Sequence, residues 1–162
     1  AGMRMRAWYD IAGFDLSRRE DEAGVRQSMA QVEALIAREN ERGIPASRIV
    51  LAGFSQGGAI ALASGLRREQ PLAGLIALST YLPLAANSIA ESTIAARTTP
   101  VFMAHGSLDP VVPEMLGRSG RDALLALGMR VEWHSYPMAH QVCPPELQAL
   151  SAWLDARFAA AA

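Results

Sequence analysis

A serine lies between two glycines where a long apolar run of the sequence is interrupted. The segment Gly53-Phe54-Ser55-Gln56-Gly57 has the spacing Gly-x-Ser-x-Gly, which is typical of the nucleophile elbow of serine hydrolases. This chemistry needs a sharp turn from strand to helix, which lifts the serine hydroxyl clear of the sheet. We expect both glycines to be required, because a Cβ at either position would collide with the turned backbone. The pattern alone also fits a serine that caps a helix.

Two further residues can complete a catalytic triad with Ser55. A serine nucleophile needs a general base, and the base needs an acid that orients it. Asp109 follows an apolar run over 100–104, and His140 follows an alternating run over 131–136. The chain order Ser, Asp, His is that of α/β-hydrolases and differs from the orders in chymotrypsin and subtilisin. The pattern therefore predicts acyl transfer, with His140 as the base and Asp109 as the orienting acid.

The remaining candidates for chemistry have simpler interpretations. His105 precedes a glycine, and we expect it to stabilise the turn that presents Asp109. His134 lies on the polar face of the alternating run, where we expect it to be solvated. Cys143 lacks the glycine context of an elbow and is interpreted as a packed or incidental thiol. No grouping of His, Asp and Glu has the spacing of metal ligands, so no metal site is predicted.

Helices and strands that alternate along the chain must position these residues. After an irregular arm over 1–16, Ser17 and Glu20 have the spacing of a capping box, and the helix that they begin ends at Gly43. Strands are predicted at 48–54, 72–79, 100–104 and 131–136, and helices at 55–69, at 113–127 and from 144 onward, the last with the apolar stripe Leu147, Leu150, Leu154 and Phe158. This alternation indicates an open, mostly parallel α/β sheet. Ligands of such sheets bind beyond the carboxyl ends of the strands, which is where the three triad candidates fall.

Length and composition restrict the class of protein. The chain has 162 residues, of which 51% are hydrophobic and 19% charged, as expected for a single soluble globular domain over 1–162. A net charge of -1 gives no electrostatic basis for binding nucleic acid. No apolar stretch approaches the ~20 residues of a membrane span, and the first residues show no signal peptide, so a cytoplasmic location is expected. The single cysteine excludes an internal disulfide and a cysteine-built zinc site.

Five stretches of the sequence resemble a known enzyme family. They are AWYDI (7–11), RIVLAGFSQGGAIAL (48–62), GLIALSTYLPL (74–84), HGSLDPVVP (105–113) and YPMAHQV (136–142). In these motifs the chain is similar to the bacterial carboxylesterases of the phospholipase/carboxylesterase group, which are relatives of the acyl-protein thioesterases. The resemblance implies an α/β-hydrolase fold and the hydrolysis of small, short- to medium-chain carboxylic esters without a cofactor.

The resemblance also implies roles for individual residues. It makes Ser55 the nucleophile, Asp109 the orienting acid and His140 the base. It places the backbone N–H of Gln56 in the oxyanion hole. The residues that it implies at the border of the substrate cleft are Trp8, Tyr81, Leu82, Val111 and Val112.

The chain departs from the family pattern upstream of Ser55. Members of the family begin with additional strands, and one of these ends in a His-Gly-Leu-Gly-like loop whose backbone N–H is the second oxyanion donor. No such loop precedes Ser55, so we expect a sheet of about four strands in an N-terminally truncated chain, either a fragment or a natural short form with a substitute donor. Two alternatives to an esterase stay open. One is a catalytically silent binding module of the same fold, and the other is an acyl-thioesterase or lysophospholipase.

The missing strands would leave one strand with an unpaired edge. The run Ile49-Val50-Leu51-Ala52 contains no charge, proline or bulge that would protect this edge. We therefore expect a homodimer in which this strand, or the face beside it, meets its own copy.

Overall fold

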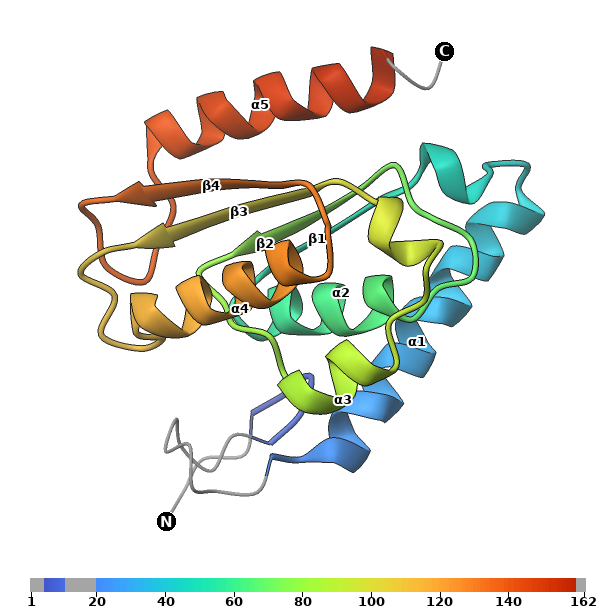
Figure 1. Ribbon diagram of the computed structural model, residues 1–162, viewed down its shortest axis with the longest axis horizontal. Coiled ribbons are helices and arrows are strands. Elements are labelled where there is room, and N and C mark those ends of the chain that lie inside the picture. Colours follow the sequence, from blue (N-terminus) through green and yellow to red (C-terminus); the bar gives the residue numbers. More distant parts are fainter. Residues whose placement is uncertain (1–4, 11–19, 160–162) are drawn as a thin grey trace.

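The computed structural model describes residues 5–10 and 20–159, and these contain one four-stranded sheet with helices on both faces (Figure 1). The strands are β1 (Val50–Phe54), β2 (Gly74–Leu78), β3 (Val101–Gly106) and β4 (Val131–Tyr136). The helices are α1 (Glu22–Glu41), α2 (Gln56–Leu66), α3 (Ala85–Ala90), α4 (Glu114–Ala126) and α5 (Pro144–Ala159), with short 3-10 turns at Ala46–Arg48 and Ala96–Thr98. None of the described helices is long and apolar enough to cross a membrane.

The strands follow the order β1-β2-β3-β4, and every neighbouring pair is parallel. This confirms the parallel α/β sheet predicted from the sequence. Right-handed crossovers that always advance in one direction place their helices on the same face of a sheet. Accordingly, α2 and α4 lie together on one face, with α1 packed beyond α2, while α5 covers the opposite face (Figure 1). The carboxyl ends of all four strands lie on the same side of the sheet, where the loops after β1, β3 and β4 meet.

The core is divided by the sheet into two layers. The larger cluster joins α1, α2 and α4 to one face, and the smaller one packs Trp153 of α5 against Phe102 and its neighbours on the other. Every residue of β2 and β3 is buried, because helices cover both faces. The two outer strands are less covered. In β1 the side chain of Phe54 is 39% exposed.

The position of β1 bears on the expectation of a dimer. Among the described residues β1 is hydrogen-bonded to β2 alone. The strand that was predicted to have an unpaired edge is therefore an outer strand of this sheet. Pairing of two copies through it stays a prediction.

The start of α1 differs from the sequence prediction. The helix begins at Glu22, and its N-cap is Asp21, whose carboxylate accepts the N–H of Gly24 at 2.9 Å. Glu20 lies before the N-cap, and its carboxylate accepts the backbone N–H of Leu84. The other residue of the predicted capping box, Ser17, lies outside the described residues. The end of the helix is as predicted, since Gly43 follows it with a φ of +90° that suits glycine.

The apolar stripe predicted for α5 is confirmed in its middle and wrong at both ends. Leu147 is 50% exposed and Phe158 39% exposed, whereas Trp153 is 6% exposed and faces the sheet. The indole packs so closely on β2 that a Cβ at Gly74 would lie 2.4 Å from its ring. This contact fixes the rotation of the helix about its axis. Leu150 and Leu154 are partly buried beside Trp153.

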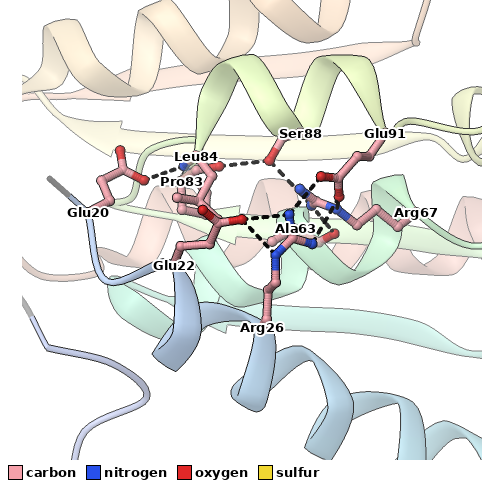
Figure 2. A network of polar contacts seen from close by, with 9 residues as sticks. All are labelled: Glu20, Glu22, Arg26, Ala63, Arg67, Pro83, Leu84, Ser88 and Glu91. Carbon is pink, nitrogen blue, oxygen red and sulfur yellow. Dashed lines mark hydrogen bonds and ion pairs between the residues drawn. The ribbon is translucent and has the colours of Figure 1, made fainter.

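The connection from β2 to β3 is an ordered strap that contains α3 and a 3-10 turn. Glu91, just after α3, accepts hydrogen bonds from Arg26 of α1 at 2.7 Å and from Arg67 after α2 at 2.5 Å (Figure 2). These bonds lower the pKa of Glu91 to about 2, and the bond from Arg26 has the larger effect. At the other end of α3, Ser88 donates to the carbonyl of Pro83 at 2.7 Å. The strap therefore fixes the chain that follows Thr80, close to the candidate site.

Candidate active site

Ser55 occupies a strained turn between β1 and α2. Its φ of 55° and ψ of -122° lie in a region that non-glycine residues rarely adopt. Two bonds hold the turn in place: the Ser55 N–H donates to Leu78 O at 2.8 Å, and the Thr80 hydroxyl donates to Ser55 O at 2.6 Å. The Ser55 side chain makes no capping hydrogen bond to α2. The turn thus presents the hydroxyl without using it to stabilise the helix, which argues against the helix-cap interpretation.

The glycines around Ser55 are required in a different pattern from the one expected. A Cβ at Gly53 would lie 2.1 Å from the backbone of Gly57, so glycine is needed there as predicted. At Gly57, however, a Cβ would meet a single atom of the described residues, the Trp8 indole nitrogen at 3.6 Å, which is an ordinary contact. The tight position is the next one, because a Cβ at Gly58 would lie 2.8 Å from the Thr80 side chain and 2.9 Å from Gly53 O. The prediction that Gly57 is sterically required is therefore wrong.

This pattern predicts opposite results for two neighbouring alanine substitutions. We expect Gly57→Ala to change the melting temperature by less than about 3 °C, because alanine also favours the helix. Gly58→Ala should lower it by several times more, since Thr80 and the strand must move. Thermal unfolding followed by circular dichroism measures both. Equal losses in the two variants would contradict this difference in packing between Gly57 and Gly58.

Asp109 and His140 are brought together at the ends of β3 and β4. The two side chains share a hydrogen bond of 2.7 Å between His140 Nδ1 and Asp109 Oδ2. The other carboxylate oxygen, Oδ1, accepts the N–H groups of Val111 at 2.8 Å and Val112 at 2.9 Å. Burial alone would raise the pKa of Asp109, but the bond from His140 and the two backbone bonds outweigh it and lower that pKa. Asp109 is thus ionised and can only accept, so in the neutral form of the ring the His140 proton sits on Nδ1 and Nε2 is a proton acceptor.

The loops that carry this pair are joined to each other. Ser107 N–H donates to Tyr136 O at 2.8 Å, and Leu108 N–H donates to Met138 O at 3.1 Å. A Cβ at Gly106 would lie 2.3 Å from the backbone oxygen of Ala139, so glycine permits this close approach. These contacts fix the distance between the two loops.

The elbow reaches the pair through the residue before the nucleophile. The ring of Phe54 contacts that of His140, with their centroids 4.7 Å apart. In the described part of the chain no hydrogen bond joins the Ser55 hydroxyl to the His140 ring. Such bonds are often long before substrate binds. The structure therefore brings the three predicted residues to one edge of the sheet and joins two of them directly.

His105 has the supporting position expected from the sequence. Its side chain is 1% exposed, and Nε2 donates to the carbonyl of Val112 at 2.9 Å. Because Val112 N–H binds Asp109, this bond holds the turn that presents the carboxylate. His134 differs from the expectation of a solvated side chain, since it stacks on Phe102 at 5.2 Å and pairs with Glu132 at 2.8 Å.

Sequence reasoning missed a buried carboxyl group at the start of α5, just after the loop that carries His140. Glu146, in the first turn of α5, is 0% exposed, and its Oε2 accepts the backbone N–H of Cys143 at 3.3 Å. Its other oxygen has no hydrogen-bond partner among the described residues. Burial, which outweighs the bond from Cys143 and the field of His134, raises the pKa of Glu146. The spacing of Cys143 and Glu146, that of a residue at the N-cap and one at N3, was the available signal. Cys143 itself is a half-buried free thiol.

The buried carboxyl predicts a pH-dependent stability. A raised pKa means that folding disfavours the ionised form, so stability falls as pH rises from 4.5, the ordinary pKa, to the raised value. Glu146→Gln, which stays neutral and keeps an acceptor for Cys143, should be more stable than the parent at pH 7, and the gap should close near pH 4. Urea unfolding at both pH values measures this, with Glu41→Gln at an exposed position as the control. A glutamine variant that is less stable at pH 7 would contradict it.

The residues implied at the substrate cleft have different surroundings. Trp8 is 41% exposed and Val111 47% exposed, so both offer surface to a ligand. Tyr81 is half-buried, with its hydroxyl 2.6 Å from that of Tyr9. Leu82 and Val112 are 5% and 1% exposed, so they contribute by packing and present no surface.

The backbone N–H of Gln56, which the resemblance places in the oxyanion hole, lies at the start of α2. The hydrogen bonds of this helix begin with the bond from Ala59 N–H to Ser55 O at 3.1 Å, so the Gln56 N–H has no acceptor within the helix.

An apolar groove of about 280 Å³ lies elsewhere, beside the free edge of β1. It is lined by α1, β1, α2 and Trp8, and Glu39 is the one charged side chain among the described residues that line it. Neither Asp109 nor His140 lines it, and Gly57 is the part of the elbow that it touches. The groove is therefore separate from the carboxylate-imidazole pair.

Comparison with known proteins supports the assignment suggested by this geometry. The profile of the family described as Phospholipase/Carboxylesterase matches residues 1–157. "Acyl-protein thioesterase 1" of Neurospora crassa is 46% identical, and the alignment covers 96% of this chain and 67% of that protein. The protein of the same name from Mycosarcoma maydis is 45% identical, with 95% and 70% covered. These relatives are fungal, so the bacterial part of the sequence resemblance is not confirmed.

Solved structures agree with the sequence comparison. SOBER1 of Arabidopsis thaliana superposes with a TM-score of 0.90 at 30% identity, and the match covers 97% of this chain and 76% of that one. Acyl-protein thioesterase 2 of Zea mays superposes with a TM-score of 0.81 at 30% identity, covering 93% and 72%. The fold, the family profile and the sequence identity agree. The chain belongs to the phospholipase/carboxylesterase family of α/β-hydrolases.

Proposed function

We propose that the protein hydrolyses short- to medium-chain carboxylic esters through an acyl-enzyme formed on Ser55. The observation that carries this proposal is the 2.7 Å hydrogen bond between His140 and the ionised Asp109, at the same sheet edge as the strained Ser55 turn. A carboxylate, an imidazole and a serine hydroxyl are the three members of the catalytic triad of serine hydrolases. Family membership supports a hydrolase of the esterase or thioesterase kind.

The proposed reaction follows from the proton positions. Asp109 keeps the His140 proton on Nδ1, so Nε2 takes the proton of Ser55 as its oxygen attacks the acyl carbon. The Gln56 N–H donates to the oxyanion that develops on the acyl oxygen. The leaving group departs with the proton from His140. Water then gives a proton to His140 as it attacks the acyl carbon. His140 returns this proton to the Ser55 oxygen as the acyl bond breaks, which releases the acid and restores the Ser55 hydroxyl.

An acyl-thioesterase is a second candidate, favoured by the names of the relatives "Acyl-protein thioesterase 1". The same residues would act, and the leaving group would depart as a thiol with the proton from His140. The two activities are separated by the ratio of kcat/KM for an octanoyl thioester and the octanoyl p-nitrophenyl ester. A ratio above about 10 would assign the protein as a thioesterase, and a ratio below about 0.1 as an esterase. A lysophospholipase would instead release fatty acid from lysophosphatidylcholine faster than from either.

A fluorophosphonate probe tests whether Ser55 is an activated nucleophile. The serine oxygen displaces fluoride from phosphorus and forms a stable phosphonyl ester, which requires a base in place. We expect one adduct per chain, located on Ser55 by peptide mass spectrometry, and none after heat denaturation. A folded protein that takes up no probe would favour the catalytically silent binding module.

A further inference from the structure

The side chain of Gln56 makes two hydrogen bonds that an oxyanion donor does not need. The backbone N–H of Trp8 donates to Gln56 Oε1 at 3.3 Å, and Gln56 Nε2 donates to the backbone carbonyl of Tyr9 at 2.8 Å. Only one orientation of the amide satisfies both bonds, because an N–H must face its oxygen and a carbonyl its nitrogen. The residue after Ser55 is thus fastened to a segment 47 residues earlier in the chain.

Further polar contacts hold this segment against the rest of the fold. They are the bonds from Ser28 to the Trp8 carbonyl, from Asp10 N–H to the Asp21 carboxylate, and between the Tyr9 and Tyr81 hydroxyls. Tyr9 is 7% exposed and belongs to the larger core cluster. The segment therefore has anchors on α1 and on the strap that do not depend on Gln56. What the Gln56 amide adds is a fixed position relative to the serine turn.

Trp8 is the member of this segment that can meet a substrate. It is 41% exposed, although its neighbour Tyr9 is buried. Its indole nitrogen lies 3.6 Å from the position of a Cβ at Gly57, two residues after Ser55. A long acyl group that leaves Ser55 across the first turn of α2 would contact this rigid apolar ring, whereas an acetyl group would be too short to reach it.

We propose that Gln56 is a positioning residue for acyl-chain selection, because its carboxamide holds Trp8 beside the serine turn. The inference rests on the hydrolase function proposed above and adds a determinant of its substrate range. In this arrangement the backbone of Gln56 serves the oxyanion, and its side chain serves the acyl chain by acting through Trp8.

A double-mutant cycle tests whether Gln56 acts through Trp8. The variants are Gln56→Leu, Trp8→Ala and the double variant, assayed with acetyl and octanoyl p-nitrophenyl esters. Each single substitution should reduce kcat/KM for the octanoyl ester about tenfold more than for the acetyl ester, mainly through KM. The double variant should lie within about twofold of Trp8→Ala, since the second change removes nothing further. Additive losses, or equal losses on both esters, would overturn the proposal in favour of an effect on the oxyanion donor.

Amide hydrogen exchange gives a readout that does not depend on turnover. The Trp8 amide should exchange at least about tenfold faster in Gln56→Leu than in the parent, because its acceptor is lost. Gln31→Leu, the same change at an exposed position of α1, should leave that rate unchanged. A parent that hydrolyses neither ester would defeat the proposed function alone. An unchanged Trp8 exchange rate in Gln56→Leu would defeat the inference about Gln56, whatever the activity.

Discussion

Ser55→Ala is expected to abolish hydrolysis while leaving the fold intact. Removal of the nucleophile of a serine hydrolase lowers kcat by about 10⁶-fold, so the variant should fall to the background rate of ester hydrolysis. The substitution removes one oxygen that makes no capping bond to α2. Alanine also keeps the Cβ that the turn already accommodates at a φ of 55°. The melting temperature should therefore stay close to that of the parent.

The measurement is kcat/KM on p-nitrophenyl butyrate, with the melting temperature of the same preparation as the test of folding. Ser151→Ala, at an exposed position of α5, is the matched control and should retain the parental rate. Activity of Ser55→Ala above about 1% of the parent would exclude Ser55 as the nucleophile. Loss of the fluorophosphonate adduct in the same variant would link the two experiments.

Those parts of the site that depend on local pattern could be predicted from the sequence. A strand that runs into Gly-x-Ser-x-Gly places Ser55 at its carboxyl end, and the same holds for Asp109 and His140 after their strands. Because all strands of the sheet are parallel, their carboxyl ends share one edge. Three local patterns and one rule of topology thus determine which residues meet.

Features that depend on contacts between distant segments could not be predicted in this way. Whether a glycine is needed at 57 or at 58 depends on where the Thr80 side chain packs, and nothing near the motif indicates this. The rotation of α5 depends on the fit of Trp153 over Gly74. The link from Gln56 to Trp8 and Tyr9 requires an arm whose own sequence predicts no regular structure. In each case the deciding neighbour lies more than twenty residues away.

Asp109→Asn tests the proton arrangement that the proposed mechanism requires. In the parent, Oδ1 accepts two backbone N–H groups, from Val111 and Val112, and Oδ2 accepts His140 Nδ1–H. An asparagine must keep its oxygen at the Oδ1 position, because the opposite orientation would point its NH₂ group at two N–H donors. The amide nitrogen then faces His140 and donates to Nδ1. The ring is forced to carry its proton on Nε2, where it can no longer accept the proton of Ser55.

We therefore expect Asp109→Asn to lower kcat by about 10⁴-fold, the effect of the equivalent change in a well-studied serine protease. Because both backbone bonds of Oδ1 survive, the fold and the loop should be retained, and the loss should appear in kcat rather than in the melting temperature. The rate of fluorophosphonate labelling should fall in parallel, since it needs the same base. Asp122→Asn, the same substitution in an ion pair on α4, is the control and should keep the parental rate. If Asp109→Asn stayed within tenfold of the parent while remaining folded, Asp109 would not be the residue that orients His140, and the triad would have to be abandoned.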